Sequence, residues 1–442
     1  MTNTENDTIF ALSSGAGVAA VAVVRLSGPR AGEALRALTG KALPPARRLA
    51  LRTLRAPADG AMIDQALVAW LPGPRTFTGE DMVELHVHGG RAVIELLLDT
   101  LGGMEGLRAA ERGEFTRRAL LCGRLDLLEV EGLADLLQAE TRAQQQLAIM
   151  ALRGAASERV KQWRVALVEL LALFEAAIDF IDEEDVAEQA LSGIDSRLQR
   201  IVSDMRRAVE ASRPAERVRE GVRVAIAGPP NAGKSSLLNW LARREVALVS
   251  DMPGTTRDVL EVRLDLDGIP VTVLDTAGLR REASDKVEAM GIERARRAVE
   301  DADIVLWMQA PDVERQAPPP IDSPVIRIWN KADIDSSPER NGWRVVSVKQ
   351  ERGLDALLDC LRREVRARFG GVESALFTRA RQRQAIARAM AELEAVQSRS
   401  DLPVELAAEH VRRAVRALDE LIGRVDVEEL LDHIFAEFCI GK

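Results

Sequence analysis

The sequence predicts a multidomain protein that combines a small α/β domain, a helical domain and a doubly wound α/β domain of the Ras-like type. Its 442 residues exceed the roughly 250 to 300 residues that one hydrophobic core can organise, so two or three domains are expected. A glycine-rich loop at 228–236 lies between an apolar strand pattern and an apolar helix pattern, as the doubly wound fold requires. Elsewhere apolar residues recur at spacings of three and four, which is typical of helices with one buried face.

The N-terminal domain is expected at residues 1–120. Short β-like runs at 18–26, 65–71 and 83–87 alternate there with short helical stretches and Gly/Pro turns. This alternation indicates a compact α/β domain.

The helical domain is expected in two parts, at 121–215 and 371–442, with the Ras-like domain inserted between them at 216–370. The first part carries apolar side chains at the spacing of one long helix, at Leu167, Leu170, Leu171, Phe174, Ile178 and Ile181. The second part resumes the same spacing from Leu418 to Phe438. A helical pattern that stops and resumes around an α/β pattern predicts the insertion.

Composition narrows the class of protein. Three cysteines, Cys122, Cys360 and Cys439, are too few and too scattered for a disulfide framework, and no uninterrupted run of 18 apolar residues occurs. We therefore expect a reduced, cytoplasmic, soluble protein without a membrane segment. The net charge of −9 argues against a globally basic nucleic-acid binder, yet residues 25–55 carry eight Arg or Lys and only one acid, Glu33. Such a run could touch a polyanion, although solvated surface is its more common meaning.

The loop at 228–236 reads GPPNAGKSS and predicts nucleotide binding. Its consecutive backbone N–H groups would point at phosphate oxygens, Lys234 would reach the β- and γ-phosphates, and the Ser235 hydroxyl would bind Mg²⁺. The residues of this loop expected at the nucleotide are Asn231, Ala232, Gly233, Lys234, Ser235 and Ser236.

The choice of nucleotide is predicted by Asn330, Lys331 and Asp333, in the sequence NKAD after a buried-strand pattern. A carboxylate there can accept hydrogen bonds from N1–H and the exocyclic amino group of guanine, whereas adenine presents an acceptor in place of the first donor. Guanine is therefore expected. A later loop of Ser347, Val348 and Lys349 resembles the one whose backbone touches the guanine oxygen in GTPases.

Two further loops are expected to sense the γ-phosphate. GTTRD occupies 254–258, and DTAG supplies Asp275, Thr276, Ala277 and Gly278. The strand pattern before DTAG is predicted to pair with the pattern at 262–266 through an Asp267-Gly268 turn, which places Asp275 at a strand end near Mg²⁺.

One residue argues against an ordinary Ras-like mechanism. Leu279 follows DTAG, where a glutamine that orients the attacking water would be expected. Asn231 and the hydroxyl-rich segment 250–256 offer oxygens that could hold a monovalent cation against the phosphates. The alternative for Asn231 is a side chain that only caps the loop.

Five further segments carry a family resemblance over essentially the whole chain. They read FTGEDMVELHVHGG at 77–90, GEFTRRALLCGRLDL at 113–127, AAIDFIDEED at 176–185, GIERA at 291–295 and FCIGK at 438–442. Together with GTTRD and DTAGLR, these segments resemble the MnmE family, also called TrmE, of tRNA-modification GTPases.

The resemblance implies a homodimer formed through the N-terminal domain, which would bind 5-formyl- or methylene-tetrahydrofolate. It also implies a heterotetramer with a FAD-dependent partner similar to MnmG (GidA). Together the two proteins would add an aminomethyl or carboxymethylaminomethyl group to C5 of the tRNA wobble uridine. By matching motif positions, the folate-contacting residues would be Arg25, Glu84, Arg124 and Lys442.

The resemblance also assigns ions in the GTPase domain. Asn231 and Thr255 would bind K⁺ with Ser250 and the Met252 carbonyl, while Ser235 and Thr256 would bind Mg²⁺. Potassium would replace an arginine finger when two GTPase domains meet. The segment expected at the nucleotide comprises Ser250, Asp251, Met252, Pro253, Gly254, Thr255 and Thr256.

Besides Lys234, two more residues are expected to have catalytic roles, and both assignments come from the resemblance. Arg281 is an extra residue after DTAGLR, so the water-orienting glutamate of the family matches Glu288 and not Glu282. Cys439 would be a reactive thiol near the folate. The alternatives are a solvated helix position for Glu288 and a small buried hydrophobe for Cys439.

His86 and His88 lie two residues apart on one strand face, a spacing that can bind a metal. Without a third ligand nearby, structural or folate-pocket roles are favoured. Two other functions remain open from the middle domain alone, a ribosome-assembly GTPase and a signalling switch.

Overall fold

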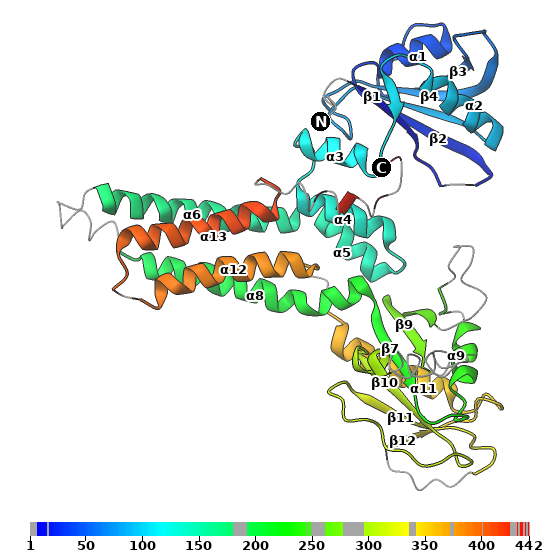
Figure 1. The fold of residues 1–442 in the computed structure, drawn as a ribbon, viewed down its shortest axis with the longest axis vertical. Helices are drawn as coiled ribbons and strands as arrows, with labels where there is room; N and C mark the ends of the chain where they lie inside the picture. The colour runs from blue at the N-terminus through cyan, green and yellow to red at the C-terminus, as the bar shows by residue number, and fades with distance from the viewer. Residues whose placement is uncertain are drawn as a thin grey trace, which may run out of the picture. The chain divides into compact units, whose positions relative to one another are not determined.

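The computed structural model describes residues 7–15, 17–179, 192–244, 246–248, 261–276, 296–335, 342–371, 375–399 and 401–424, with Leu431, Ile434, Phe435, Phe438 and Gly441 (Figure 1). The chain divides into two compact units. The first comprises Met1–Ala134, Ser157–Lys161 and Leu418–Lys442, and the second comprises Asp135–Ala156 and Gln162–Ala417. The N-terminal domain, the helical segments and the P-loop domain expected from the sequence are all present, whereas the domain boundaries stay predictions.

The first unit is built on a six-stranded sheet in the order β3-β4-β5-β2-β1-β6. The strands are β1 (Thr8–Leu12), β2 (Ala19–Ser27), β3 (Leu49–Arg55), β4 (Met62–Leu71), β5 (Met82–Gly89) and β6 (Leu107–Ala109). They pair antiparallel except for β1 with β6. The three strand runs expected from the sequence therefore correspond to β2, β4 and β5.

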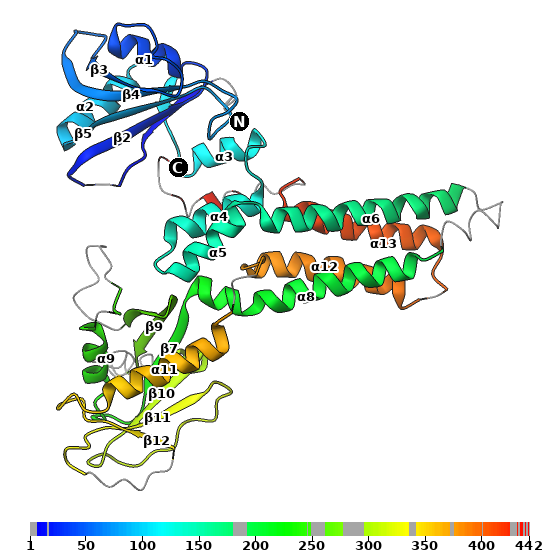
Figure 2. The same ribbon diagram turned by 180° about the vertical axis from the view of Figure 1, so that it is seen from behind.

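Successive side chains along these strands point to opposite faces of the sheet, and one of the two faces is covered by helices. Helices α1 (Ala31–Thr39) and α2 (Arg91–Gly102) pack there (Figure 2). The shared core is apolar and buried, and includes Val24, Leu26, Leu35, Leu38, Leu85, Val87, Leu97 and Leu101. The residues between these on β2 and β5, among them Arg25 and Glu84, must then point to the opposite face.

The second unit contains a six-stranded sheet in the order β12-β11-β10-β7-β9-β8. Its strands are β7 (Val222–Ala227), β8 (Glu261–Leu266), β9 (Ile269–Asp275), β10 (Ile304–Gln309), β11 (Val325–Trp329) and β12 (Trp343–Val345). All neighbours are parallel except β8 with β9. Helices α9 (Lys234–Ala242) and α11 (Leu354–Phe369) complete this Ras-like domain.

The predicted hairpin between β8 and β9 is confirmed. Leu266 pairs with Ile269, and the two turn residues Asp267 and Gly268 have positive φ values of 56° and 88°. Two successive positive φ angles are the signature of the tight turn that matches strand twist.

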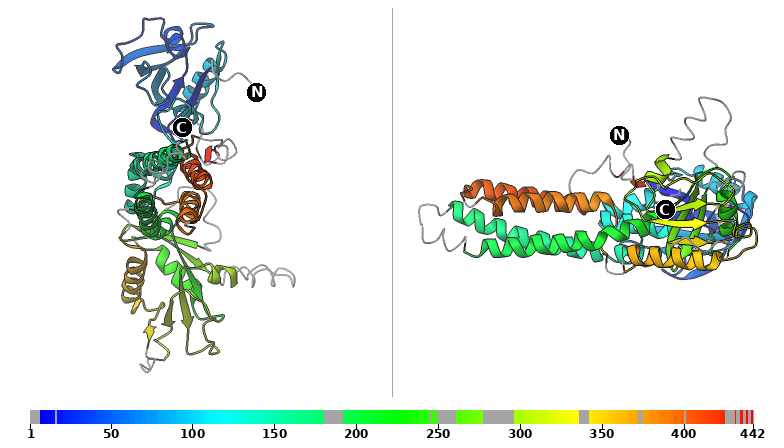
Figure 3. Two further views of the ribbon diagram at one scale, coloured as in Figure 1. Left: turned by 90° about the vertical axis from the view of Figure 1, so that its left-hand side faces the viewer. Right: turned by 90° about the horizontal axis from the view of Figure 1, so that it is seen from below.

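Further helices lie in the described residues outside the two sheet domains. They are α4 (Leu127–Gln138), α5 (Arg142–Leu152), α6 (Ala155–Asp179), α8 (Ile194–Glu220), α12 (Ala380–Gln397) and α13 (Val404–Leu421). Within the second unit α12 lies along α8 (Figure 3). Arg412 of α13 forms an ion pair with Glu175 of α6. Pro214 lies inside α8, so the helix continues past the proline to Glu220, close to the predicted start of the GTPase domain.

Candidate functional site

The nucleotide loop lies between the carboxyl end of β7 and the first turn of α9. Lys234 is buried and donates hydrogen bonds from Nζ to the Gly228 and Pro229 carbonyl oxygens, at 2.9 and 2.8 Å. Gly233 has a φ of 99°, and a Cβ added there would lie 2.2 Å from Asn330 Nδ2. The loop can close this tightly only because its backbone carries no side chain at that point.

Ser235 and Asp275, which are expected near Mg²⁺, meet at the edge of the sheet. Ser235 Oγ donates a hydrogen bond to Asp275 Oδ2 at 2.5 Å, from the start of α9 to the end of β9. A hydroxyl oxygen and a carboxylate oxygen that lie this close together fit the preference of Mg²⁺ for oxygen ligands. Thr276 continues this edge, where its hydroxyl donates to the Ile226 carbonyl at 2.9 Å.

Asn330 joins the phosphate side of the site to the base side. Its Nδ2 donates to the Ala232 carbonyl at 2.8 Å, and its Oδ1 accepts from the Val348 backbone N–H at 3.1 Å. The side chain is buried, so both bonds form away from water. Three loops expected separately from the sequence are thus brought together by one amide.

The carboxylate expected to select guanine lies beside this amide. Asp333 Oδ1 accepts a hydrogen bond from Ser347 Oγ at 2.6 Å, and this bond lowers the pKa of the Asp333 carboxyl. Lys331 has a φ of 59°, and its Nζ forms an ion pair with Asp312 at 2.6 Å. An ionised Asp333 presents only acceptors, as pairing with guanine N1–H and its amino group requires.

The phosphate side of this site borders a cavity of about 760 Å³. Its lining includes the nucleotide loop, Thr276, Asp312 and Lys331. Asn231 lines it as well and has a φ of 64°, a conformation that asparagine adopts more readily than most residues. Ser236 also lines it, whereas Lys349 lies on the base-side loop.

Several predicted site residues lie outside the described residues. In the GTPase domain they are Ser250, Asp251, Met252, Pro253, Gly254, Thr255, Thr256, Ala277, Gly278 and Glu288, and at the chain end Cys439 and Lys442.

In the first unit, the structure brings Arg25 and Glu84 together. They pair directly across β2 and β5, and Arg25 Nη2 lies 3.0 Å from Glu84 Oε1. His86 Nε2 lies 3.3 Å from Glu84 Oε2, while His88 Nδ1 lies 2.8 Å from Asp64 Oδ1 on β4. Each histidine therefore has its own carboxylate partner, and no group of three or more potential metal-ligating side chains occurs in the described residues.

The loop at 72–81 connects this pair to Arg124. The Phe77 ring lies 5.9 Å from the Arg25 guanidinium, and Arg124 Nε donates to the Thr76 carbonyl at 3.2 Å. Arg25 Nε is buried and has no hydrogen-bond partner among the described residues. A buried donor of this kind is costly unless something accepts from it.

The chain end reaches the same sheet. Ser13 Oγ donates to the Gly441 carbonyl at 2.9 Å, and a Cβ on Gly441 would lie 2.2 Å from the Leu12 carbonyl oxygen. The residue before Lys442 is therefore held at the end of β1, next to the strand that carries Arg25.

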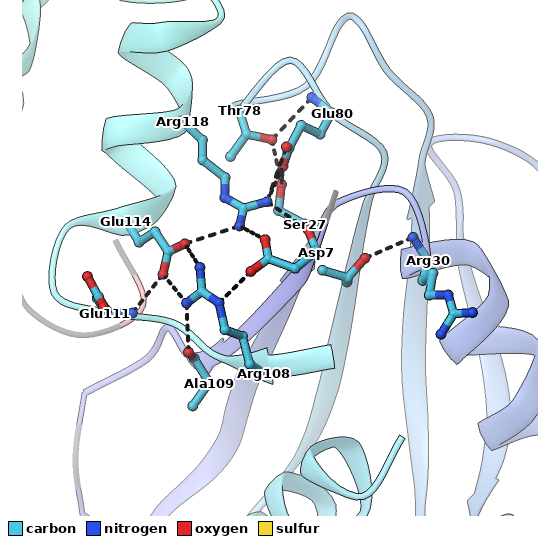
Figure 4. Close-up of polar contacts among 11 residues, drawn as sticks. Asp7, Ser27, Arg30, Thr78, Glu80, Arg108, Ala109, Glu111, Glu114 and Arg118 are labelled. Atoms are coloured by element: carbon cyan, nitrogen blue, oxygen red, sulfur yellow. Dashed lines mark hydrogen bonds and ion pairs between the residues drawn. The ribbon is translucent and has the colours of Figure 1, made fainter. Parts of the chain in front are cut away.

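A partly buried ion network that the sequence did not single out holds α3 (Glu114–Leu121) to the sheet (Figure 4). Arg118 contacts Asp7 at 2.6 Å, Glu114 at 3.1 Å and Glu80 at 3.2 Å, and Arg108 also contacts Asp7 and Glu114. Burial would raise the pKa of the Glu114 and Asp7 carboxyls, but the two arginines more than offset it and hold both pKa values below their usual range.

The network also reaches the loop that carries Phe77. Ser27 Oγ donates to Glu80 Oε2 at 2.7 Å and lies 2.7 Å from Thr78 Oγ1. The i,i+4 spacing of Glu114 and Arg118 within GEFTRRA was the available sequence signal, but the partners Asp7 and Glu80 lie too far along the chain to be found by spacing.

Family models match nearly the whole chain. The one described as the GTP-binding protein TrmE N-terminus matches residues 8–124, and the one described as the MnmE helical domain matches residues 127–439. The G domain of the T. maritima FeoB iron transporter is similar over 33% of this chain and 98% of that chain, with 23% identity and a TM-score of 0.24.

Curated relatives agree with the family models. The tRNA modification GTPase MnmE of Methylobacterium sp. (strain 4-46) is 51% identical over 440 residues, which cover 99% of this chain and 100% of the relative. The protein of the same name from Bradyrhizobium sp. (strain ORS 278) is 49% identical over 447 residues, covering 99% of each. With the GTPase site and full-length matches together, the chain belongs to the MnmE (TrmE) family of tRNA modification GTPases.

Proposed function

We propose that this protein hydrolyses GTP in the service of tRNA wobble-uridine modification. With a FAD-dependent partner similar to MnmG (GidA), it adds an aminomethyl or carboxymethylaminomethyl group to C5, and a tetrahydrofolate derivative supplies the one-carbon unit. The observation that carries this proposal is the Asn330 amide, which joins the phosphate loop to the guanine loop in a chain that matches the family from end to end.

The described residues account for GTP binding. Lys234 would exchange its loop carbonyls for phosphate oxygens, Asp333 would accept from guanine, and Ser235 with Asp275 would hold Mg²⁺. Magnesium supplies charge neutralisation at the phosphates. Ser235 and Asp275 fit it because their oxygens already lie in contact.

Potassium is proposed at Asn231, whose side chain belongs to the loop that lines the cavity. Its other proposed ligands are Ser250, Met252 and Thr255, and the proposed water-orienting residue is Glu288. Because Leu279 cannot orient water, hydrolysis would depend on the cation and on pairing of two GTPase domains.

Folate binding is proposed on the open face of the N-terminal sheet. Arg25 Nε has no hydrogen-bond partner in the part of the chain that the structure describes. This donor, the Glu84 carboxylate beside it and Arg124, which is bonded to the loop that carries Phe77, fit a ligand with a carboxylate tail and a polar ring edge. Gly441 at the end of β1 supports the same role for Lys442.

The same face supports a homodimer. Leu49 and Leu51 of β3 and Leu67 of β4 are exposed by 57%, 57% and 43%, and strand register places them on the face that carries Glu84. Contiguous exposed apolar side chains of this kind mark interaction sites. We propose a cytoplasmic protein, and no helix among the described residues is long and apolar enough to span a bilayer.

The test of this proposal separates its two activities. K⁺ should stimulate GTP hydrolysis and Na⁺ should not at matched ionic strength, and Asn231→Ala should remove the difference. In cells that lack the endogenous protein, the wild-type chain should restore the modified wobble nucleoside, measured by nucleoside analysis of bulk tRNA. Glu288→Ala should slow hydrolysis with GTP affinity retained, and Cys439→Ser should impair modification alone. Equal rates in both salts, or no restored nucleoside, would contradict the proposal.

A further inference from the structure

One edge of the N-terminal sheet carries cations that neither proposed site uses. We define the basic edge as Lys41, Arg47, Arg48, Arg52 and Arg55, which lie on β3 and on the loop that leads into it. Four of them are exposed and Arg52 is half-buried. They account for five of the eight cations in the basic run at 25–55.

Arg52 and Arg55 lie on a strand at the edge of the sheet. β3 is the terminal strand of the sheet order and pairs with β4, and within the described ranges no other strand pairs with it. Seven residues make it about 20 Å long, at roughly 3.3 Å per residue. A surface of that length can meet several successive phosphates of a nucleic-acid strand.

Backbone contacts hold two members of the basic edge without neutralising their charge. Arg47 Nη2 donates to the Pro72 carbonyl at 3.1 Å, and Arg55 Nη1 donates to the Gly60 carbonyl at 3.1 Å. These bonds orient the guanidinium groups and leave further N–H donors on each. The positive charge is therefore fixed in place and uncompensated by its anchors.

None of the five cations forms an ion pair with a described residue. The acids close to them in sequence have other partners, since Glu33 lies 3.6 Å from Arg30 and Asp64 lies 2.8 Å from His88. Asp59 accepts from the Ala61 backbone N–H at 2.9 Å. In a chain with a net charge of −9, five cations without acids form a local exception that attracts a polyanion.

We propose that the basic edge binds the phosphate backbone of tRNA. The choice of tRNA rests on the proposed function, in which tRNA is the substrate. Four of the five cations are arginines, whose planar guanidinium groups bind phosphate in a bidentate manner. Protection of an edge strand from pairing with another chain also uses charge, but it does not require five cations without acidic partners.

The experiment measures binding of fluorescently labelled tRNA to the full chain between 50 and 200 mM KCl, with the double variant Arg48→Gln/Arg55→Gln. Loss of two phosphate contacts should weaken binding about tenfold or more near 100 mM salt. It should also lower the slope of log affinity against log salt by about 1.4 to 1.8. The matched control is Arg91→Gln on α2 of the same domain, an exposed arginine that lies 2.7 Å from Glu95 and should keep the wild-type slope.

Thermal melting of each variant checks that the domain stays folded. Wild-type affinity and slope in the double variant would overturn the proposal, as would an equal loss in Arg91→Gln. Self-association of the double variant with unchanged tRNA affinity would assign the cations to edge protection. Weaker binding of the flavin partner with unchanged tRNA affinity would assign them to a protein interface, and both results overturn it.

The wild-type chain distinguishes this inference from the proposed function. If the wild-type chain restores wobble modification but the double variant keeps the wild-type salt slope, the tRNA-binding role of the basic edge is refuted and the proposed function stands. An altered slope without restored modification refutes the proposed chemistry and leaves the basic edge standing.

Discussion

The GTP site and the N-terminal site are constructed differently. The GTP site depends on close packing of loop backbone at the carboxyl ends of parallel strands, where Gly233 permits a contact that no side chain allows. The proposed N-terminal site, with the ion network beside it, is formed by side chains from paired antiparallel strands and α3, held by Arg108 and Arg118. A site that depends on close backbone packing, here called backbone-built, should therefore lose ligand binding when a small side chain is added. A site held by charged side chains, here called side-chain-built, should be destabilised when a charge is removed.

The largest expected effect tests the backbone-built site. Gly233→Ala places a Cβ 2.2 Å from Asn330 Nδ2 at a φ of 99°, so the loop must shift away from Asn330. Backbone strain of about 1 to 2 kcal/mol and overpacking of about 1 to 3 kcal/mol together predict a loss of about 4 kcal/mol in GTP binding. Isothermal titration with a non-hydrolysable GTP analogue measures it. Gly342→Ala, with open space around its Cβ, controls for φ strain alone, and equal losses in both variants would contradict the steric account.

The next effect tests the side-chain-built site. Arg118→Met removes one cation from a network in which Asp7, Glu80 and Glu114 each contact it. Leaving partly buried carboxylates without this partner should lower the free energy of unfolding by about 3 kcal/mol. Urea denaturation followed by tryptophan fluorescence measures the loss. Arg91→Met, at an exposed pair, should leave the free energy of unfolding close to the wild-type value, and a similarly small loss in Arg118→Met would show that the network is not important for stability.

A smaller effect sharpens the functional side of the comparison. Asp333→Asn replaces an acceptor carboxylate by an amide that also donates, so GTP should bind about 2 kcal/mol more weakly, within the range of about 1.5 to 3 for a hydrogen bond to a charged group. Xanthosine triphosphate should bind better than to the wild type, because xanthine carries a carbonyl where guanine carries an amino group. Competition binding measures both affinities. Unchanged preference for GTP would mean that Asp333 serves only its bond to Ser347.

The same difference explains what could be read from the sequence. Lys234, Ser235, Asn330 and Asp333 belong to short motifs whose spacing is set by one turn of backbone, so their convergence follows from strand order. The Asp267-Gly268 hairpin was predicted for the same reason.

The N-terminal contacts could not be found in this way. Arg25 and Glu84 are 59 residues apart, and only the strand register, which depends on the packed core, places them side by side. Arg118 and Asp7 are separated by 111 residues. Spacing along the chain carries no information about such pairs, so the sequence indicated those residues only through the family resemblance or not at all.

The smallest expected effect concerns acid stability and tests whether the N-terminal network acts through charge. Arg108 and Arg118 lower the pKa values of Asp7 and Glu114 despite burial, so these carboxyls are easier to ionise in the folded protein than in the unfolded chain. Their contribution is complete above the ordinary carboxyl pKa values, near pH 4 to 4.5, and is lost as pH falls through the lowered values. Melting temperature measured from pH 7 to pH 3 should therefore fall more steeply below about pH 4.5 in the wild type than in Glu114→Gln, which carries one titrating carboxyl fewer. Glu95→Gln, at an exposed pair on α2, should follow the wild-type curve. Parallel curves for Glu114→Gln and the wild type would mean that hydrogen bonding and packing, and not ionisation, hold α3 to the sheet.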